Sequence, residues 1–398
     1  MISLDFVNTL AAAGVVLFAG HAIQRRIPLL ARYAVPPPVI GGLLVALGVT
    51  GLRASGHAAV AFDTTLQAPL MIAFFTAVGF GASLPLLRSG GPAVALFLAI
   101  ATAVGLVQNV VGEGVAHVLG VPPLLGVIAG SLTLMGGPAT GLAFAPLFEQ
   151  AGVPGAATLA VASAMVGIVA GGILGGPIGS FLIERHRLRA TEDPAPAQGP
   201  ADARPATASG PAPGGRALLK GVVTILAAMA IGSWVSAGIT ALGLTLPAYI
   251  GAMIAAAGLR SLDDATGWLR LPHRLLEDLG HAALVLFIAM ALMTLKLWEL
   301  AGLALPLAII LAVQILLTTV LSVWPTFRLM GRDYESALMS AGFCGFMLGT
   351  TANAMANMDA LRDRHGPAPR AYFVVPMVGG FFVDFTNALL ITAFLNLR

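Results

Sequence analysis

The chain has little charge and almost no cysteine. Only 10% of its 398 residues are charged, whereas 58% are hydrophobic; a typical soluble domain has about 25% charged residues. Too few polar side chains are present to cover a surface in water, which excludes a soluble enzyme. The net charge of +3, from 21 Lys and Arg against 18 Asp and Glu, forms no dense basic face and excludes a nucleic-acid-binding protein. We therefore interpret the sequence as an integral membrane protein.

The residue patterns of common catalytic and metal sites are also missing. The single cysteine, Cys344, can form no internal disulfide and has no Cys or His neighbour at metal-ligand spacing. No nucleophile stands beside a general base, and the run GGPAT lacks the lysine and the preceding strand of a phosphate loop. We expect neither an enzyme nor an organic cofactor.

Long apolar runs dominate what is present. The first run follows Asp5 and precedes Arg25 and Arg26, a charge order opposite to that of a cleavable signal, so we predict a permanent span. A bilayer core needs about 20 apolar residues per helix, and ten runs approach this length. The predicted spans are 5–23, 38–52, 67–87, 92–119, 158–183, 217–240, 246–259, 281–299, 301–327 and 371–397.

One polar segment divides the chain. Residues 184–216 are rich in Pro, Ala and Gly with scattered charge, a composition that predicts a flexible linker. It separates two membrane halves, 1–183 and 217–398, with five predicted spans each. Because five is odd, the second half is expected to be inverted relative to the first.

The distribution of positive charge predicts the orientation. If the amino terminus lies outside and the spans alternate, only three of the 21 Lys and Arg residues fall outside, namely Arg53, Lys296 and Arg398. This bias follows the positive-inside rule. We therefore expect both termini outside and the linker in the cytoplasm.

Short matches between the halves indicate an internal repeat. Gln108 pairs with Gln314, Gly130 with Gly342, and Met165 with Met377, all in the same order and at an offset of about 210 residues. Each match could arise by chance in so Ala/Gly-rich a chain. Their shared order favours an inverted repeat, which is typical of secondary transporters.

Two apolar stretches, 123–147 and 335–357, are crowded with Gly, Ser, Thr and Asn and lie between the fourth and fifth spans of their halves. They contain GSLTLMGGPATG and GFCGFMLGTTANAMAN. We predict two re-entrant hairpins whose broken tips meet near the membrane midplane, because broken backbone is tolerated only inside protein or beside water. Helix amino termini there would bind an anion, and freed carbonyls at Gly136, Gly137 and Gly349 would bind a hard cation. The alternative is a pair of ordinary kinked helices packed through glycine.

The candidate substrate-binding residues lie at these two breaks: Gly136, Gly137, Pro138, Ala139, Thr140, Gly349, Thr350, Thr351 and Asn353.

A carboxylate in the last predicted span supplies the strongest ion signal. Asp384 lies among hydrophobic residues about halfway along that span, where an ionisable group needs a partner or a cavity. Asn387, three residues on, shares its helical face. The alternatives are a substrate ammonium as its partner, a proton site, and a neutral, hydrogen-bonded Asp. Gln108 and Asn109 also lie mid-span, where they would line the path or bond neighbouring helices. The candidate sodium ligands are Asp384, Asn387, Asn357 and Thr133.

The sequence also resembles the bacterial sodium/glutamate symporters. The likeness covers nearly the whole chain except the linker and includes PPPVIGGLLVAL, GSLTLMGGPATG, AGFCGFMLGTTANAMANM and FVVPMVGGFFVDFTNALL. It implies an all-α elevator-type transporter of the bacterial inner membrane, in contact with lipid. It also implies a homodimer in which a transport domain carrying both hairpins moves against a scaffold. The implied activity is sodium-coupled import of L-glutamate or a related acidic amino acid.

Two positions depart from the family pattern. Typical members have GGHGT and GHCGF, whereas this chain has Pro138 and Phe343 in place of the two histidines. A missing donor in each hairpin would alter the acid that binds or the proton sensitivity of transport. A different small carboxylate or amino acid, with sodium or proton coupling, therefore remains the alternative cargo.

Overall fold

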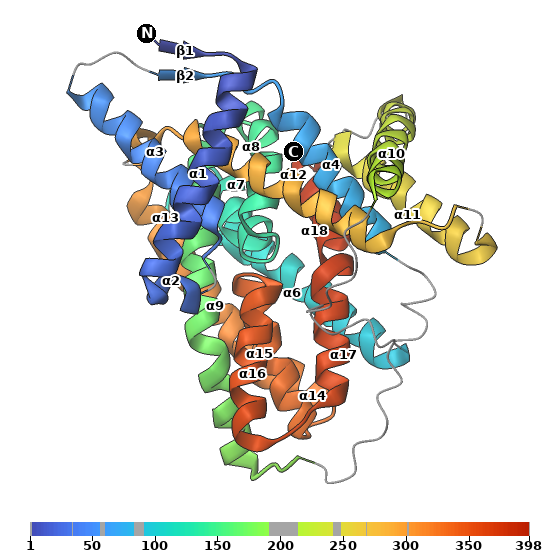
Figure 1. Cartoon of the computed structure of the whole chain (residues 1–398). Coiled ribbons are helices and arrows are strands. Elements are labelled where there is room, and N and C mark those ends of the chain that lie inside the picture. The colour runs from blue at the N-terminus through green and yellow to red at the C-terminus, as the bar shows by residue number, and fades with distance from the viewer. Residues whose placement is uncertain are drawn as a thin grey trace. The chain divides into compact units, whose positions relative to one another are not determined.

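The computed structural model describes residues 2–33, 35–55, 60–82, 91–190, 214–241, 248–267, 269–300 and 302–397, and nearly all of them are helical (Figure 1). They form two compact units. Unit 1 comprises Met1–Ile27, Pro36–Arg88 and Ala206–Trp298, and unit 2 comprises Pro28–Val35, Ser89–Pro205 and Glu299–Arg398. Each unit thus takes segments from both halves of the sequence.

Unit 1 consists mainly of uninterrupted helices. Its first helix begins where Asp5 accepts a hydrogen bond from the backbone N–H of Asn8 at 2.8 Å, and its second begins with Pro37, which is favoured in a first helical turn. The helices are α1 (Phe6–Arg26), α3 (Pro37–Ala54), α4 (Gln67–Gly81), α10 (Gly215–Ala241), α11 (Ala248–Thr266) and α12 (His273–Met293).

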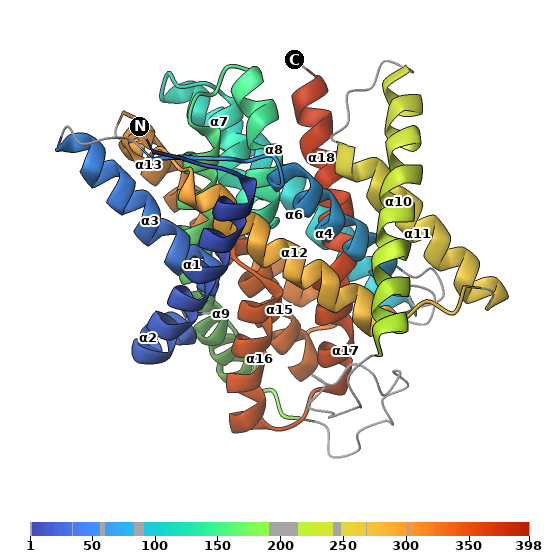
Figure 2. The same ribbon diagram turned by 45° about the horizontal axis from the view of Figure 1, so that its top comes forward.

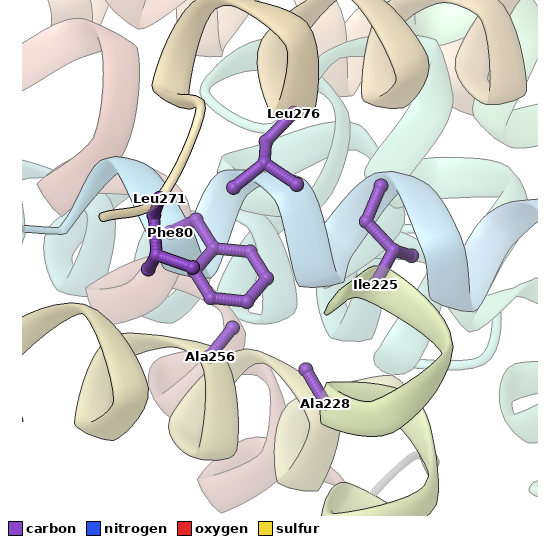
Figure 3. Packing of buried hydrophobic residues seen from close by; sticks show 6 residues of the cluster. All are labelled: Phe80, Ile225, Ala228, Ala256, Leu271 and Leu276. Carbon is purple, nitrogen blue, oxygen red and sulfur yellow. The ribbon is translucent and has the colours of Figure 1, made fainter. Parts of the chain in front are cut away.

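A close-packed apolar cluster joins four of these helices. Phe80 of α4 lies against Ala256 of α11 and Leu276 of α12, with Ile225 and Ala228 of α10 beside them (Figure 3). Figures 1 and 2 both show α10 alongside α11. Lipid is as apolar as these side chains, so close packing rather than exclusion of water favours this association.

A short sheet was not expected from the sequence. Strands β1 (Ile2–Leu4) and β2 (Val60–Phe62) pair in parallel, with Ile2 opposite Val60. The sequence pattern contains no sign of these strands, because three-residue segments are too short to give a periodic pattern; the pair leaves the predicted all-α class unchanged.

Unit 2 contains interrupted helices. Figures 1 and 2 show α15, α16 and α17 side by side. Among the described residues of this unit, π-helical segments interrupt the regular helices at η1 (Ile128–Leu132), η4 (Ser322–Thr326) and η5 (Val378–Phe382). The α-helices are α2 (Pro28–Arg32), α6 (Gly91–Val118), α7 (Leu124–Val127), α8 (Gly137–Gln150), α9 (Ala156–His186), α13 (Ala304–Leu321), α14 (Phe327–Leu329), α15 (Tyr334–Leu348), α16 (Thr351–His365), α17 (Pro369–Met377) and α18 (Val383–Asn396). A short 3₁₀ turn, η3 (Leu297–Leu300), precedes α13.

Seven of the described helices are long and apolar enough to cross a membrane, and an eighth span results if the bent pair Pro369–Gly380 and Val383–Asn396 is one span. Two other predicted spans correspond to α4, which has only 15 residues, and to α11, which carries Arg260, Asp263 and Asp264. The full set of ten stays a prediction. The predicted linker falls largely outside the described residues, although α9 extends into it as far as His186.

Two predicted span boundaries need correction. The span predicted at 281–299 is a helix from His273 to Met293, because the apolar pattern continues past the true helix end. The last span is bent by 42° between α17 and α18 rather than straight.

Candidate ion and substrate site at two helix breaks

The first break interrupts the stretch 123–147. Gly130 leaves the helical conformation at φ −105° and ψ −134°, and residues 133–136 separate η1 from α8. The Thr133 hydroxyl donates to the Ile128 carbonyl at 2.6 Å. Gly137 begins α8 with φ +66°, a left-handed conformation that glycine adopts without strain. Pro138 follows in the first turn, where its missing N–H costs no helical bond.

The second break separates α15 from α16. It occurs at Gly349, with φ −149° and ψ −105°. The Thr350 hydroxyl donates to Asn353 Oδ1 at 2.8 Å and accepts from the Asn353 backbone N–H at 3.4 Å, so Thr350 caps the amino terminus of α16. Both breaks therefore lie where glycine, proline and threonine predicted them.

The two breaks lie close together. A Cβ atom placed on Gly137 would be 4.0 Å from the carbonyl oxygen of Gly349. Because α8 and α16 both begin at these breaks, two helix amino termini with unpaired N–H groups lie in one neighbourhood. Gly136, Ala139, Thr350 and Thr351 are partly exposed there, whereas Pro138 and Thr140 are buried.

The bent last span reaches both breaks. The Asn387 side-chain amide donates to the Ser131 carbonyl at the first break, at 2.9 Å, and the Thr351 hydroxyl of α16 donates to the Gly379 carbonyl in η5 at 2.8 Å. Asp384 lies one turn before Asn387 and is half-buried. In the part of the chain that the structure describes, its carboxylate forms no hydrogen bond or ion pair.

Unpaired buried oxygens surround the first break. Asn387 Oδ1 and Ser131 Oγ are buried and have no hydrogen-bond partner among the described residues. Both are oxygen donors of the kind that hard cations prefer, and Asp384 precedes Asn387 by one helical turn on α18. Sequence reasoning did not select Ser131, although its place directly after Gly130 is a usable signal.

Two predicted residues have other partners. The Asn353 side-chain amide donates to the Ile168 carbonyl at 2.7 Å, and the Asn357 amide donates to the Gly171 carbonyl at 2.9 Å, so both tie α16 to α9. Within the described ranges, Asn357 makes no hydrogen bond with Asp384 or Asn387. Of the four predicted sodium ligands, Thr133 and Asn387 therefore bond at the first break, Asn357 bonds α9, and Asp384 lies on α18 one turn before Asn387.

Helix α6 contributes two further buried amides. Gln108 Nε2 donates to Thr318 Oγ1 at 2.9 Å and to the Met347 carbonyl at 3.2 Å, and Asn109 Oδ1 accepts from the Ser131 backbone N–H at 3.0 Å. Gln314 Nε2 in turn donates to the Gln108 carbonyl at 2.5 Å. Gln108 and Gln314, which the sequence pattern predicts to be equivalent positions of a repeat, are thus in direct contact.

Comparison with known proteins identifies the family. Residues 2–367 match the family described as sodium/glutamate symporter. The chain belongs to the sodium/glutamate symporter family. The sodium/glutamate symporter of Escherichia coli strain K12 is 39% identical over 100% of this chain and 99% of its own length, and that of Haemophilus influenzae is 36% identical over 96% and 95%. A sodium proton antiporter structure from Methanocaldococcus jannaschii matches 98% of both chains at 14% identity with a TM-score of 0.43, too low to support an argument.

The two departures from the family pattern have clear structural surroundings. Pro138 is buried in the first turn of α8. Phe343 is fully buried, with its ring centroid 5.5 Å from that of Phe97 and 5.3 Å from that of Phe346. Position 343 therefore serves aromatic packing, and neither position provides a side-chain hydrogen-bond donor.

Proposed function

We propose that this protein is a symporter that uses sodium to import L-glutamate, or a closely related acidic amino acid, across the bacterial cytoplasmic membrane by alternating access. The observation that carries the proposal is the approach of two helix breaks, one from each half of the chain, beside Asn387 and Asp384. Membership of the symporter family agrees with it. The protein is a transporter, not an enzyme.

The substrate binds at the two broken tips. Its carboxylates accept hydrogen bonds from backbone N–H groups at the amino termini of α8 and α16, where the helix dipoles favour negative charge. The hydroxyls of Thr140, Thr350 and Thr351 supply further polar contacts. The backbone of Gly136, Gly137 and Gly349 allows close approach of the substrate, and Pro138 and Ala139 shape the first tip. Asn353 orients Thr350 through their shared hydrogen bond.

Sodium binds through Asp384, Asn387 and Thr133, and Asn357, the fourth predicted ligand, can join them only through its side-chain oxygen because its amide nitrogen bonds the Gly171 carbonyl. Asp384 balances the positive charge of the ion, and the ion in turn holds the broken backbone in the shape that the substrate needs. Each ligand therefore raises the affinity for the other by the same factor. The contacts of Asn387 and Thr133 with the first break support this pairing.

We further propose an inverted-repeat architecture with both termini outside and the linker 184–216 inside. Two of the residues predicted outside share one region of unit 1, because Arg53 and Lys296 line a cavity of about 370 Å³ together with Val60 and Phe62 of β2, which pairs with β1. The Arg53 guanidinium also lies 4.1 Å from the Trp298 ring centroid. Residues predicted inside likewise meet, because Lys220 donates to the carbonyls of residues 269 and 270.

In this proposal unit 2 is the transport domain and unit 1 the scaffold of an elevator mechanism. Both predicted re-entrant hairpins, 123–147 and 335–357, belong to unit 2. A homodimer held through the scaffold and surrounded by lipid follows from the family resemblance. One sodium with monoanionic glutamate would be electroneutral, whereas two would move one net charge, which contributes about 2.3 kcal/mol per 100 mV.

The test is uptake of radiolabelled glutamate into proteoliposomes under an imposed sodium gradient. We expect saturable, counterflow-competent uptake that is lost when choline replaces sodium at a fixed pH gradient. Uptake that ignores sodium but follows the pH gradient would instead establish proton coupling. Non-saturable uptake without counterflow would identify a channel.

A different small carboxylate or amino acid is the second candidate cargo. The absence of a side-chain donor at Pro138 and Phe343 favours it. Competition of glutamate uptake by a panel of unlabelled dicarboxylates, hydroxycarboxylates and amino acids distinguishes the two. Stronger competition by an acid other than glutamate would replace the substrate and leave the mechanism intact.

A further inference from the structure

Two consecutive residues of α6 each reach one of the helix breaks. Gln108 and Asn109 are both completely buried. Neighbouring side chains on a helix diverge by about 100°, so adjacent residues can contact different partners. Gln108 bonds the chain just before the second break, and Asn109 bonds the chain at the first break.

Each side chain compensates for a backbone interruption. The Met347 carbonyl lies in the last turn of α15, where carbonyls have no partner within the helix, and Gln108 Nε2 donates to it. The Ser131 N–H follows Gly130, where the backbone leaves the helical conformation, and Asn109 Oδ1 accepts from it. Unsatisfied backbone groups are costly in a membrane, so both breaks depend on α6.

The two amides have fixed orientations. Gln108 Nε2 must face the Met347 carbonyl and Thr318 Oγ1, which leaves Gln108 Oε1 without a partner among the described residues. Asn109 is oriented with Oδ1 toward the Ser131 N–H, which leaves its Nδ2 unpaired in the same part of the chain. From α13, Gln314 holds the Gln108 backbone.

We infer that Gln108 and Asn109 are positioning residues that couple the two breaks, so that a change of backbone shape at one is transmitted through α6 to the other. The inference rests on the proposed function, because it assigns the coupling between sodium and the acidic substrate to this pair. Neither residue is a ligand in it. Instead, the two residues set the ratio between the affinity for glutamate in the presence of sodium and that in its absence.

The binding test uses the purified full-length protein in nanodiscs. Gln108→Met and Asn109→Leu preserve approximate size and remove the polar groups. Calorimetry gives the Kd of glutamate with and without sodium, and the ratio of the two values is the coupling factor. We expect each variant to lower this factor about tenfold, equivalent to about 1.4 kcal/mol, and the double variant to lose little more than either single variant because both belong to one link.

Two control variants separate coupling from folding. In Thr102→Val, the lost hydroxyl bonds only the Leu98 carbonyl within α6, at 2.9 Å, so the coupling factor should stay unchanged. Asn109→Asp retains the acceptor for the Ser131 N–H and should keep more coupling than Asn109→Leu. If Gln108→Met and Asn109→Leu raise both Kd values of glutamate by the same factor, the coupling factor is unchanged. The role of the two residues is then merely structural and the inference is wrong.

A second readout does not depend on the ligand. Hydrogen exchange of the unliganded protein is measured by mass spectrometry over residues 128–137 and 346–353. We expect Gln108→Met and Asn109→Leu each to accelerate exchange at both breaks. If exchange is accelerated only at the break that loses its bond, the inference is wrong. This result would count against it whether or not transport requires sodium. Absence of any sodium effect on wild-type glutamate binding, with exchange linked at both breaks, would instead refute the proposed function alone.

Discussion

The two units of the molecule differ in where they bury polar side chains. In the described part of unit 1 the buried polar residues are Thr9, Thr76 and Asp263, whereas unit 2 buries an extensive set that includes Gln108, Asn109, Ser131, Asn353 and Asn387. The π-helical segments among the described residues also belong to unit 2. Unit 1 is held by apolar packing, and unit 2 combines such packing with side-chain bonds to interrupted backbone.

This difference shows how a membrane protein can assign structural stability to one unit and ligand binding to another. A continuous helix satisfies its own backbone and offers a ligand little, whereas a broken helix exposes N–H and carbonyl groups that need partners. In unit 2 those partners include amides on α6 and α18. If the comparison reflects function, changes in unit 2 should alter coupling, and changes in unit 1 should alter stability alone.

The largest effect is expected at Asp384. Asp384→Asn removes the carboxylate charge from the proposed cation site, so the sodium concentration for half-maximal uptake should rise about thirtyfold, equivalent to about 2 kcal/mol. The matched change in unit 1 is Asp63→Asn, in the segment between β2 and α4, where the carboxylate accepts from the Thr65 N–H. It should leave sodium activation unaltered. Sodium-titrated uptake checks both, and equal curves for wild type and Asp384→Asn would remove Asp384 from the site.

The second effect tests unit 1. Asp263 accepts hydrogen bonds from the backbone N–H groups of Leu269, Arg270 and Leu271 at 2.8 to 2.9 Å. Burial raises its pKa, but these bonds outweigh burial and lower the pKa below its usual value. Asp263→Ala should cost about 2 kcal/mol of stability, with the sodium dependence of uptake unchanged.

Acid should reproduce this loss in the wild type. A lowered folded-state pKa means that the contribution of Asp263 is complete above the unfolded-state pKa and disappears as the pH falls through the folded-state value. Thermal unfolding in detergent, measured against pH, checks this behaviour. The exposed Asp278→Ala should shift stability by less than about 0.5 kcal/mol. A changed sodium dependence in Asp263→Ala would contradict the division between the units.

The smallest effect compares two glycines. Gly137→Ala adds no close contact but places a side chain at φ +66°, which should cost about 1 kcal/mol and slow uptake by distorting the first break. Gly48 lies inside α3 with nothing within 4 Å of an added Cβ. Gly48→Ala should therefore stabilise by up to about 1 kcal/mol without slowing uptake. Unfolding midpoints and initial uptake rates are the measurements. If Gly137→Ala changes neither, the first break tolerates a different backbone conformation at this position.

Local chemistry made much of the fold predictable. The breaks at Gly136–Gly137 and at Gly349 follow from residues that interrupt helices, and Asp384 drew attention because charge is rare within an apolar span. The meeting of the breaks depends on tertiary packing between segments about 210 residues apart. Nothing in the local pattern indicated that Asn353 and Asn357 would bond the backbone of α9.

Other features escaped prediction for different physical reasons. Ser131 matters through a carbonyl and a buried hydroxyl whose roles arise only when α6 and α18 pack beside it. The strand pair β1–β2 is too short to have a period. The helix end at Met293 is followed by leucines and Trp298 between Thr294, Lys296 and Glu299, and these apolar residues extended the predicted span past the end of the helix.

Each compact unit is assembled from both sides of the linker, and this arrangement has a consequence for the gene. Phe97 lies before the linker and packs against Phe343 and Phe346 after it, so neither fragment of a chain divided between 191 and 213 can complete a unit by itself. If the two halves arose by duplication of an ancestral half, each copy would have contributed segments to both units rather than forming a domain of its own. Recombination that exchanged one half between distant relatives would have to preserve both sides of this aromatic contact at once.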